Sequence, residues 1–154
     1  MDIKRARENN IKEVKDMWVE LARLMEPYSE INELNTNADE EALEGFQKLF
    51  TDDRYAIFLG KKNTQTIGFM VLKKGKQDAR KKRYYTKISD LFVKEKHRNQ
   101  GHGKEFLEKA EDWAENHGCT YLKVSSEWEN HEARNFYKQN DYQEKQVEYS
   151  KTIQ

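Results

Sequence analysis

The chain has 154 residues, and we expect residues 1–154 to form one domain around one continuous core. Its 28 Lys and Arg residues balance its 28 Asp and Glu residues, so composition indicates no global attraction to nucleic acid or to an acidic membrane. The single cysteine excludes an internal disulfide and a cysteine-rich metal site, and no signal-peptide pattern or long apolar run is present, so we expect a cytoplasmic protein.

The first half is predicted to be a short strand followed by two helices. Residues 2–6 can form the strand. Apolar residues recur at helical spacing over residues 11–25, which predicts an amphipathic helix that Pro27 ends. A polar stretch then leads to a second helix over residues 39–50.

From Tyr55 onward the pattern changes to short β-rich runs. The runs YAIFLG and TIGFMVLKK are separated by KKNTQ, which predicts an antiparallel hairpin. After a basic connector, YYTKISDLFVK is the next strand, and a turn leads into a helix that ends near Gly118. The strand CTYLKVSS, a short helix over residues 131–139 and an alternating final strand, YQEKQVEYSKTI, complete the predicted order.

This order is β, α, α, β, β, β, α, β, α, β. It combines an antiparallel hairpin region with a strand–helix–strand unit whose two strands should be parallel. We therefore expect a mixed α/β (α+β) fold with a central, mostly antiparallel sheet, and this order differs from that of a repeating doubly wound fold.

The turn before the third helix is a candidate anion site. Unpaired backbone N–H groups and the positive end of the helix dipole converge where the helix starts. Gly101 and Gly103 lack β-carbons that would block an anion, and Arg98 and Lys104 can add positive charge. The turn lacks the third glycine of a dinucleotide fingerprint and the Gly-Lys-Ser/Thr ending of a nucleotide-triphosphate loop. Spacing alone leaves a phosphate site and a tight turn equally open.

Two segments resemble motifs of the GNAT superfamily of N-acetyltransferases. Arg98-x-x-Gly101-x-Gly103, between the strand ISDLFV and an amphipathic helix, is similar to the family's pyrophosphate-binding motif. The run NHEARNFY, residues 130–137, resembles the family's Asn-x-x-Ala-x-x-Phe-Tyr helix. The usual Gly-Phe ending appears here as NDY, residues 140–142, which an Asn in the left-handed conformation can accommodate.

The resemblance implies a GNAT fold, with helices on both faces of the sheet and a splayed parallel strand pair, and acetyl-CoA as co-substrate. Main-chain groups of one strand would hold pantetheine, with Phe92 or Val93 donating an N–H to the thioester carbonyl. Asn130 would cap its helix and touch the pantetheine amides. The implied cofactor-binding set in the strand and the turn is Leu91, Phe92, Val93, Arg98, Asn99, Gln100, Gly101, His102, Gly103 and Lys104.

Acetyl transfer from a thioester to an amine requires no covalent enzyme intermediate. The protein must align the two reactants, remove a proton from the ammonium group and stabilise the departing sulfur. The resemblance places Tyr137 beside that sulfur as proton donor, whereas without the motif it would be a packing aromatic. Asp90 is our first choice as general base, and Glu30, Glu33 or a water chain are the alternatives.

The stretch from Glu26 to Glu41 carries six carboxylates and hardly any positive charge. In the family this region lines the acceptor side, so Glu30 and Glu33 would favour a cationic amine, although acidic helix starts are also common on surfaces. The expected function is therefore acetyl transfer to a primary amine of a cationic small molecule. Protein lysine or N-terminal acetylation, and a CoA-binding sensor with little transferase activity, are the alternatives.

Other features suggest further partners but have simpler explanations. The basic segment 73–83 could suggest a nucleic-acid module, yet a charged hairpin connector explains it, so we expect neither a nucleic-acid nor a membrane partner. Cys119 is more typical of a small core residue than of a nucleophile. The four histidines show no metal-ligand arrangement, so no metal is expected. The final strand could pair across a homodimer or complete the monomer's sheet.

Overall fold

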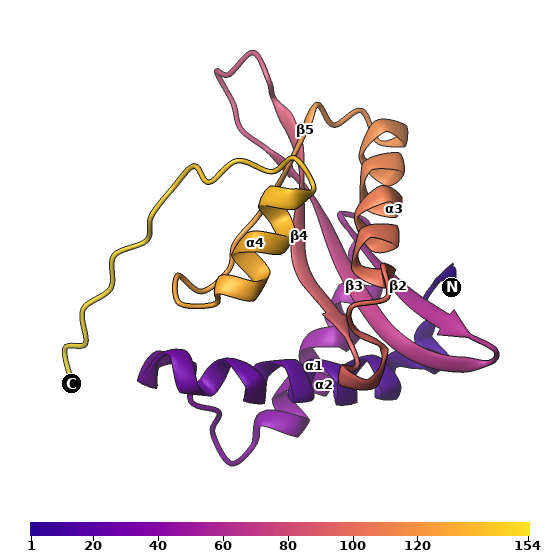
Figure 1. Ribbon diagram of the computed structural model, residues 1–154, viewed down its shortest axis with the longest axis vertical. Helices are drawn as coiled ribbons and strands as arrows, with labels where there is room; N and C mark the ends of the chain where they lie inside the picture. Colours follow the sequence, from indigo (N-terminus) through magenta and orange to yellow (C-terminus); the bar gives the residue numbers. More distant parts are fainter.

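A computed structural model describes residues 1–154, and five strands in it form one sheet in the order β1-β2-β3-β4-β5 (Figure 1). The first three pairings are antiparallel, and β4 and β5 are parallel, which confirms the predicted mixed sheet. The strands and helices are β1 (Asp2–Arg5), α1 (Ile11–Met25), α2 (Ala38–Phe50), β2 (Tyr55–Lys62), β3 (Gln65–Lys76), β4 (Tyr84–Val93), α3 (His102–Asn116), β5 (Tyr121–Val124) and α4 (His131–Gln139). Short 3-10 turns lie at Glu8–Asn10, Glu26–Tyr28, Glu30–Asn32 and Glu95–His97.

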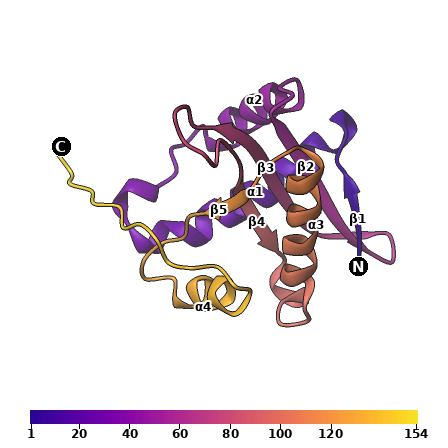
Figure 2. The ribbon, with the colours of Figure 1, turned by 90° about the horizontal axis from the view of Figure 1, so that it is seen from above.

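Helices cover both faces of the sheet, as the views in Figures 1 and 2 show. Side chains alternate between the faces of a strand, so Ile57 and Leu59 of β2 pack with α1 and α2, whereas Ala56 and Phe58 pack with α3. Both faces are apolar, and this explains why β2 and β3 appear in the sequence as nearly continuous apolar runs. None of the helices combines the length and the apolarity that crossing a membrane requires.

The two parallel strands separate after a short pairing. β5 pairs only with residues 85–88 of β4, whereas β4 continues to Val93 along β3. A bulge occurs at this point, because Leu72 of β3 pairs with Ile88 and the next residue, Val71, pairs with Asp90. The last part of β4 therefore has a hydrogen-bonding edge that β5 does not cover, and the implied splayed pair is present.

Helix α3 ends in a Schellman motif. The N–H of Cys119 donates to the carbonyl of Ala114 at 2.9 Å, and the N–H of Gly118 donates to Glu115 at 3.2 Å. Gly118 has φ +71°, the left-handed conformation that this motif requires. Cys119 is half-buried directly after this cap, so its environment is that of a turn residue, not of the sheet core.

The predicted final strand is wrong. The segment 143–154 forms no strand, and its main chain donates no hydrogen bond. Its alternating apolar side chains are exposed, with 91% of Tyr149 and 83% of Ile153 accessible. Alternation shows which side chains could share a face, but a strand exists only when its backbone pairs with a neighbour. Side chains hold this segment instead, through Glu144 with Arg134 and Thr152 with Glu30.

Candidate active site

The uncovered edge of β4 has free main-chain groups at alternate residues. The N–H of Lys94 donates to the carbonyl of Ile67 at 2.8 Å, and residues facing the partner alternate along an antiparallel ladder. With the observed register, Phe92 therefore directs its N–H and C=O to Phe69 of β3. Leu91 and Val93 direct theirs to the side from which β5 has separated.

The strand residues expected to hold pantetheine thus divide into two kinds. The register makes the main-chain groups of Leu91 and the N–H of Val93 available, while the carbonyl of Val93 accepts a hydrogen bond from Nε of Arg98 at 2.8 Å. The register does not leave the main chain of Phe92 available. Its ring is buried on the α1 and α2 face instead, with the Arg98 guanidinium 5.6 Å above it. The bulge in β4 sets this alternation, and the sequence does not reveal a bulge.

The turn before α3 presents a continuous row of donors. Six consecutive backbone N–H groups, from Asn99 to Lys104, donate to no main-chain acceptor. Asn99 and Gly101 have φ of +60° and +84°, which curves the chain around this row. A β-carbon on Gly101 would meet no atom within 4 Å, so the space above it is open. Such a row at a helix N-terminus suits a pyrophosphate group.

Glycine is required at the second position of the turn, Gly103, for a different reason, which is helix packing. A β-carbon on Gly103 would lie 2.8 Å from the ring of Phe136, so Gly103 permits α4 to pack against the start of α3. The sequence suggested that both glycines clear the way for an anion. In the structure Gly101 has that space above it, and Gly103 joins two helices.

The side chains of the turn contribute less positive charge than expected. Arg98 is bonded back to β4, and His102 is only 7% exposed. Nδ1 of His102 lies 3.3 Å from Glu105, whose carboxylate also lies 3.5 Å from the amino group of Met1. His102 can therefore offer its main-chain N–H to an anion, whereas its ring faces the protein. Asn99, Gln100 and Lys104 are exposed on the rim of the turn.

Helix α4 places Tyr137 in an aromatic cluster beside β4. Oδ1 of Asn130 accepts the N–H of Ala133 at 3.1 Å, which confirms that Asn130 caps this helix. The ring of Tyr137 lies 5.1 Å from that of Phe136 and 5.6 Å from that of Tyr142. Burial, and then the charges of Tyr142 and Asp90, raise the pKa of Tyr137 above its ordinary value. The phenol stays protonated at neutral pH and is able to donate a proton.

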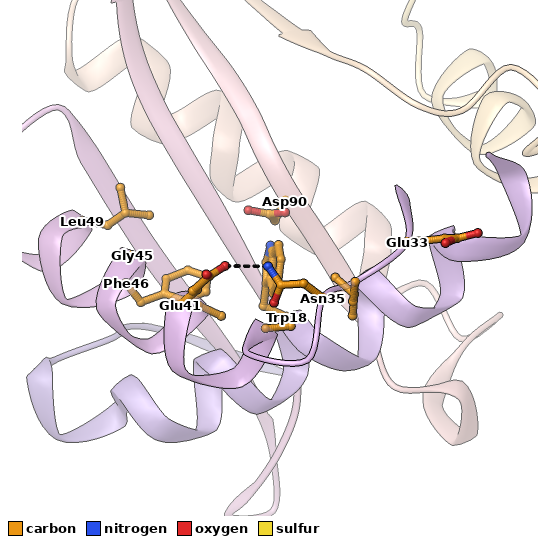
Figure 3. Close-up of a pocket in the computed structure, with 11 residues that line it drawn as sticks. Trp18, Glu33, Asn35, Glu41, Gly45, Phe46, Leu49 and Asp90 are labelled. Atoms are coloured by element: carbon orange, nitrogen blue, oxygen red, sulfur yellow. Dashed lines mark hydrogen bonds between the residues drawn. The ribbon is translucent and has the colours of Figure 1, made fainter. Parts of the chain in front are cut away.

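A cavity of about 450 Å³ opens on the opposite face of β4, between that strand, α1 and α2 (Figure 3). Trp18 and Phe46 form apolar walls, and the acidic residues Glu33, Glu41 and Asp90 are also among the lining residues. Figure 3 shows Asp90 on the β4 side and Glu41 on α2, where Glu41 accepts a hydrogen bond from Asn35 at 3.0 Å. This cavity can receive a cationic group.

Of the two acidic residues expected to bind the acceptor, Glu33 lines this cavity and Glu30 does not. Oε1 of Glu30 accepts a hydrogen bond from Thr152 at 2.7 Å. Glu41 does line the cavity, but it belonged to an acidic stretch from which the sequence could not single it out. Only the position of α2 decides which of its carboxylates face the strand.

Desolvation raises the pKa of Asp90 to about 6, and the Trp18 side chain and the charge of Lys87 partly offset the rise. A carboxyl group with this pKa is mostly ionised at pH 7, and it takes up a proton more readily than an ordinary Asp. Asp90 and Tyr137 lie on opposite sides of the same strand end. A proton acceptor and a proton donor therefore flank the open edge.

One residue that the sequence did not indicate joins the two sides of this region. Nδ2 of Asn32 donates to the carbonyl of Met25 at 3.0 Å and to Oε1 of Glu127 at 2.9 Å. It therefore ties the loop beside the cavity to the loop before α4. The two loops are 95 residues apart in the chain, so local sequence carries no signal for this contact.

The amino-acid sequence matches the model of the acetyltransferase (GNAT) family over residues 16–142, a range that contains both the open strand edge and the row of free amides. The chain belongs to the GNAT acetyltransferase family. It is accordingly an acetyl-CoA-dependent N-acetyltransferase, and the turn and the strand edge fit the pyrophosphate and the amides of that co-substrate. No curated protein sequence matches this GNAT protein significantly.

Several solved structures share the fold at low sequence identity. An aminoglycoside 6′-N-acetyltransferase from Acinetobacter haemolyticus is 19% identical, with a TM-score of 0.77 and full coverage of both chains. Another aminoglycoside 6′-N-acetyltransferase, in complex with a CoA bisubstrate analogue, is 16% identical, with a TM-score of 0.80 and coverage of 98% of this chain and 97% of that one. A ribosomal-protein-alanine N-acetyltransferase from Brucella melitensis is 15% identical, with a TM-score of 0.76 and coverage of 99% and 100%.

Proposed function

We propose that this N-acetyltransferase moves the acetyl group of acetyl-CoA directly to a primary amine of a cationic small molecule. The observation that carries the proposal is the cavity beside Asp90, which Glu33 and Glu41 also line. Three acidic residues in the lining of one small cavity favour a positively charged ligand over a neutral or anionic one. Two of the similar structures are aminoglycoside acetyltransferases, and aminoglycosides are polycationic amines.

Acetyl-CoA supplies an activated acyl group and a thiolate leaving group. In the proposal, the amides from Asn99 to Lys104 hold its pyrophosphate, and Asn130 and the open edge of β4 hold its pantetheine. The N–H of Leu91 or Val93 donates a hydrogen bond to the thioester oxygen and stabilises the negative charge that develops on it.

Asp90 removes the proton of the bound ammonium group, directly or through water. The nitrogen lone pair then forms the amide bond as the carbon–sulfur bond breaks. Tyr137 donates its phenolic proton to the sulfur, and the second proton lost by the nitrogen restores the phenol. The new amide group is neutral, so the product has one positive charge fewer than the acceptor and is held less strongly by Glu33 and Glu41.

The test combines titration calorimetry with acetyl-CoA and a thiol-release assay against polyamines, aminoglycosides, lysine peptides and neutral primary amines. We expect acetyl-CoA to bind and the cationic small molecules to be acetylated. The double variant Glu33→Gln/Glu41→Gln should raise KM for them about tenfold with little change in kcat, because it removes charge attraction and leaves the acetyl-CoA contacts intact.

Glu40→Gln is the matched control, since Glu40 lies beside Glu41 in α2 but does not line the cavity. An unchanged KM in the double variant would exclude the acidic cavity as the acceptor site. Turnover of peptides alone would replace the small-molecule proposal with protein acetylation, and binding of acetyl-CoA without any thiol release would favour a sensor.

A further inference from the structure

Gly45 is a glycine that neither backbone conformation nor packing explains. It lies in the interior of α2, where glycine costs up to about 1 kcal/mol relative to alanine. Two of the seven glycines have positive φ, and at four others a β-carbon would collide with neighbouring atoms. The former are Gly101 and Gly118, and the latter are Gly60, Gly68, Gly75 and Gly103. At Gly45 a β-carbon would meet nothing within 4 Å, and φ is not positive.

Gly45 is an exposed residue at the acceptor cavity. Gly45 lines that cavity beside Phe46, one turn after Glu41, as Figure 3 shows. Ala38 and Ala42 line it as well, so three of the six α2 residues along this wall have no side chain larger than a methyl group. Asp90, the proposed base, lies on the β4 side of the same space.

We infer that Gly45 sets the width of the acceptor cavity and admits a cationic amine with a broad, ring-bearing body. This inference rests on the proposed function. A linear amine needs only a narrow path to Asp90, whereas a ring needs the room that a side chain at residue 45 would occupy. Glycine at residue 45 thus has a steric role in acceptor choice, and this role explains why α2 contains a residue that lowers the stability of the helix.

The first experiment compares stability with acceptor preference. Gly45→Ala and Gly45→Leu should both raise the melting temperature, because each replaces a helix-interior glycine with a better helix former. Gly45→Leu should lower kcat/KM for an aminoglycoside by about tenfold or more relative to that for a linear polyamine. Gln47→Leu is the control, since Gln47 is exposed in α2 and does not line the cavity.

A second experiment needs no turnover. In a Cys119→Ser background, Gly45→Cys should react faster with a cationic methanethiosulfonate than with an anionic one, and Glu33→Gln/Glu41→Gln should remove most of that preference. Gln47→Cys in the same background is the control and should show a weaker preference.

An unchanged ratio of aminoglycoside to polyamine turnover in Gly45→Leu would overturn the inference. So would equal charge preference in the Gly45→Cys and Gln47→Cys proteins. Failure of the proposed function has a different signature, because the unsubstituted protein would then acetylate no cationic amine at all.

Discussion

Single residues on either side of the β4 end carry the proposed chemistry. The bulge in β4 turns Asp90 toward Trp18 and the acceptor cavity, and α4 supplies Tyr137 on the opposite face. Burial raises the pKa of both groups, and the two shifts have different consequences. Asp90 becomes a stronger base, while Tyr137 remains a protonated donor at neutral pH.

The pH dependence should report Asp90. Because its pKa is raised to about 6, kcat/KM for the amine should rise with pH through about 6, as the carboxylate loses its proton. Asp90→Asn should remove this limb and lower kcat. A limb that persists in Asp90→Asn would assign the titration to another group or to a water chain.

The same shift also predicts the sign of a stability change. A raised carboxyl pKa means that the folded state binds the proton more tightly, so Asp90 costs stability as pH rises from about 4 to above 6. Asp90→Asn should therefore be at least as stable as the parent at pH 8 in thermal unfolding. At pH 4, where Asp90 is protonated in the folded state, the difference should largely disappear.

Tyr137→Phe removes the proposed proton donor and keeps its packing in the aromatic cluster. We expect kcat to fall about 100-fold, with acetyl-CoA affinity nearly unchanged by calorimetry. Tyr142→Phe is the matched control, because Tyr142 belongs to the same cluster and its buried hydroxyl has no hydrogen-bond partner. It should keep normal turnover and lose no stability. Full turnover in Tyr137→Phe would leave Tyr137 with a structural role only.

At the scale of elements, helix α3 carries a left-handed glycine at each end with different consequences. Gly101 precedes its N-terminus with the row of free amides, and Gly118 closes its C-terminus in the Schellman motif. Both have φ above +70° and open space where a β-carbon would be. Substitutions at the two positions should therefore strain the backbone equally, and a difference in acetyl-CoA affinity between them reports on ligand binding alone.

Gly101→Glu places a carboxylate among the amides that should receive pyrophosphate. It should weaken acetyl-CoA binding at least tenfold in titration calorimetry, because the new charge repels and displaces the phosphates. Gly118→Glu imposes a similar backbone strain of about 1 kcal/mol at the distant end and should bind acetyl-CoA normally. Equal affinities of the two variants for acetyl-CoA would show that the turn is not part of the co-substrate site.

At the scale of the whole molecule, the balanced net charge conceals a segregation. Carboxylates gather where the α1–α2 loop and α2 meet β4, whereas lysines and arginines gather where β3 leads to β4. That hairpin projects from the body of the molecule in Figure 1. Cations lie over the tyrosine rings of this hairpin, with Lys74 of β3 4.7 Å from Tyr84 and Lys123 of the neighbouring strand β5 4.1 Å from Tyr85. These two tyrosine rings thus contact lysines of the protein itself, which agrees with a charged connector between strands.

Periodicity determined most of the elements, because spacing of 3.6 or 2 residues is a local property of the chain. It predicted residues 11–25 as a helix, and α1 spans Ile11–Met25. It failed for residues 143–154, where alternation is present but no neighbouring strand supplies hydrogen bonds. The motif from Arg98 to Gly103 specifies a local turn, and together with residues 130–137 it carried the resemblance to the family.

Only the tertiary structure decided which groups meet. The register of β4 on β3 separated the main chain of Phe92 from that of Leu91 and Val93, and the position of α2 selected Glu41 over Glu30. The open space at Gly45 depends on atoms that are distant in sequence. Local sequence specifies turns, caps and apolar faces, whereas distances across a site arise from packing between elements and appear only once the chain is folded.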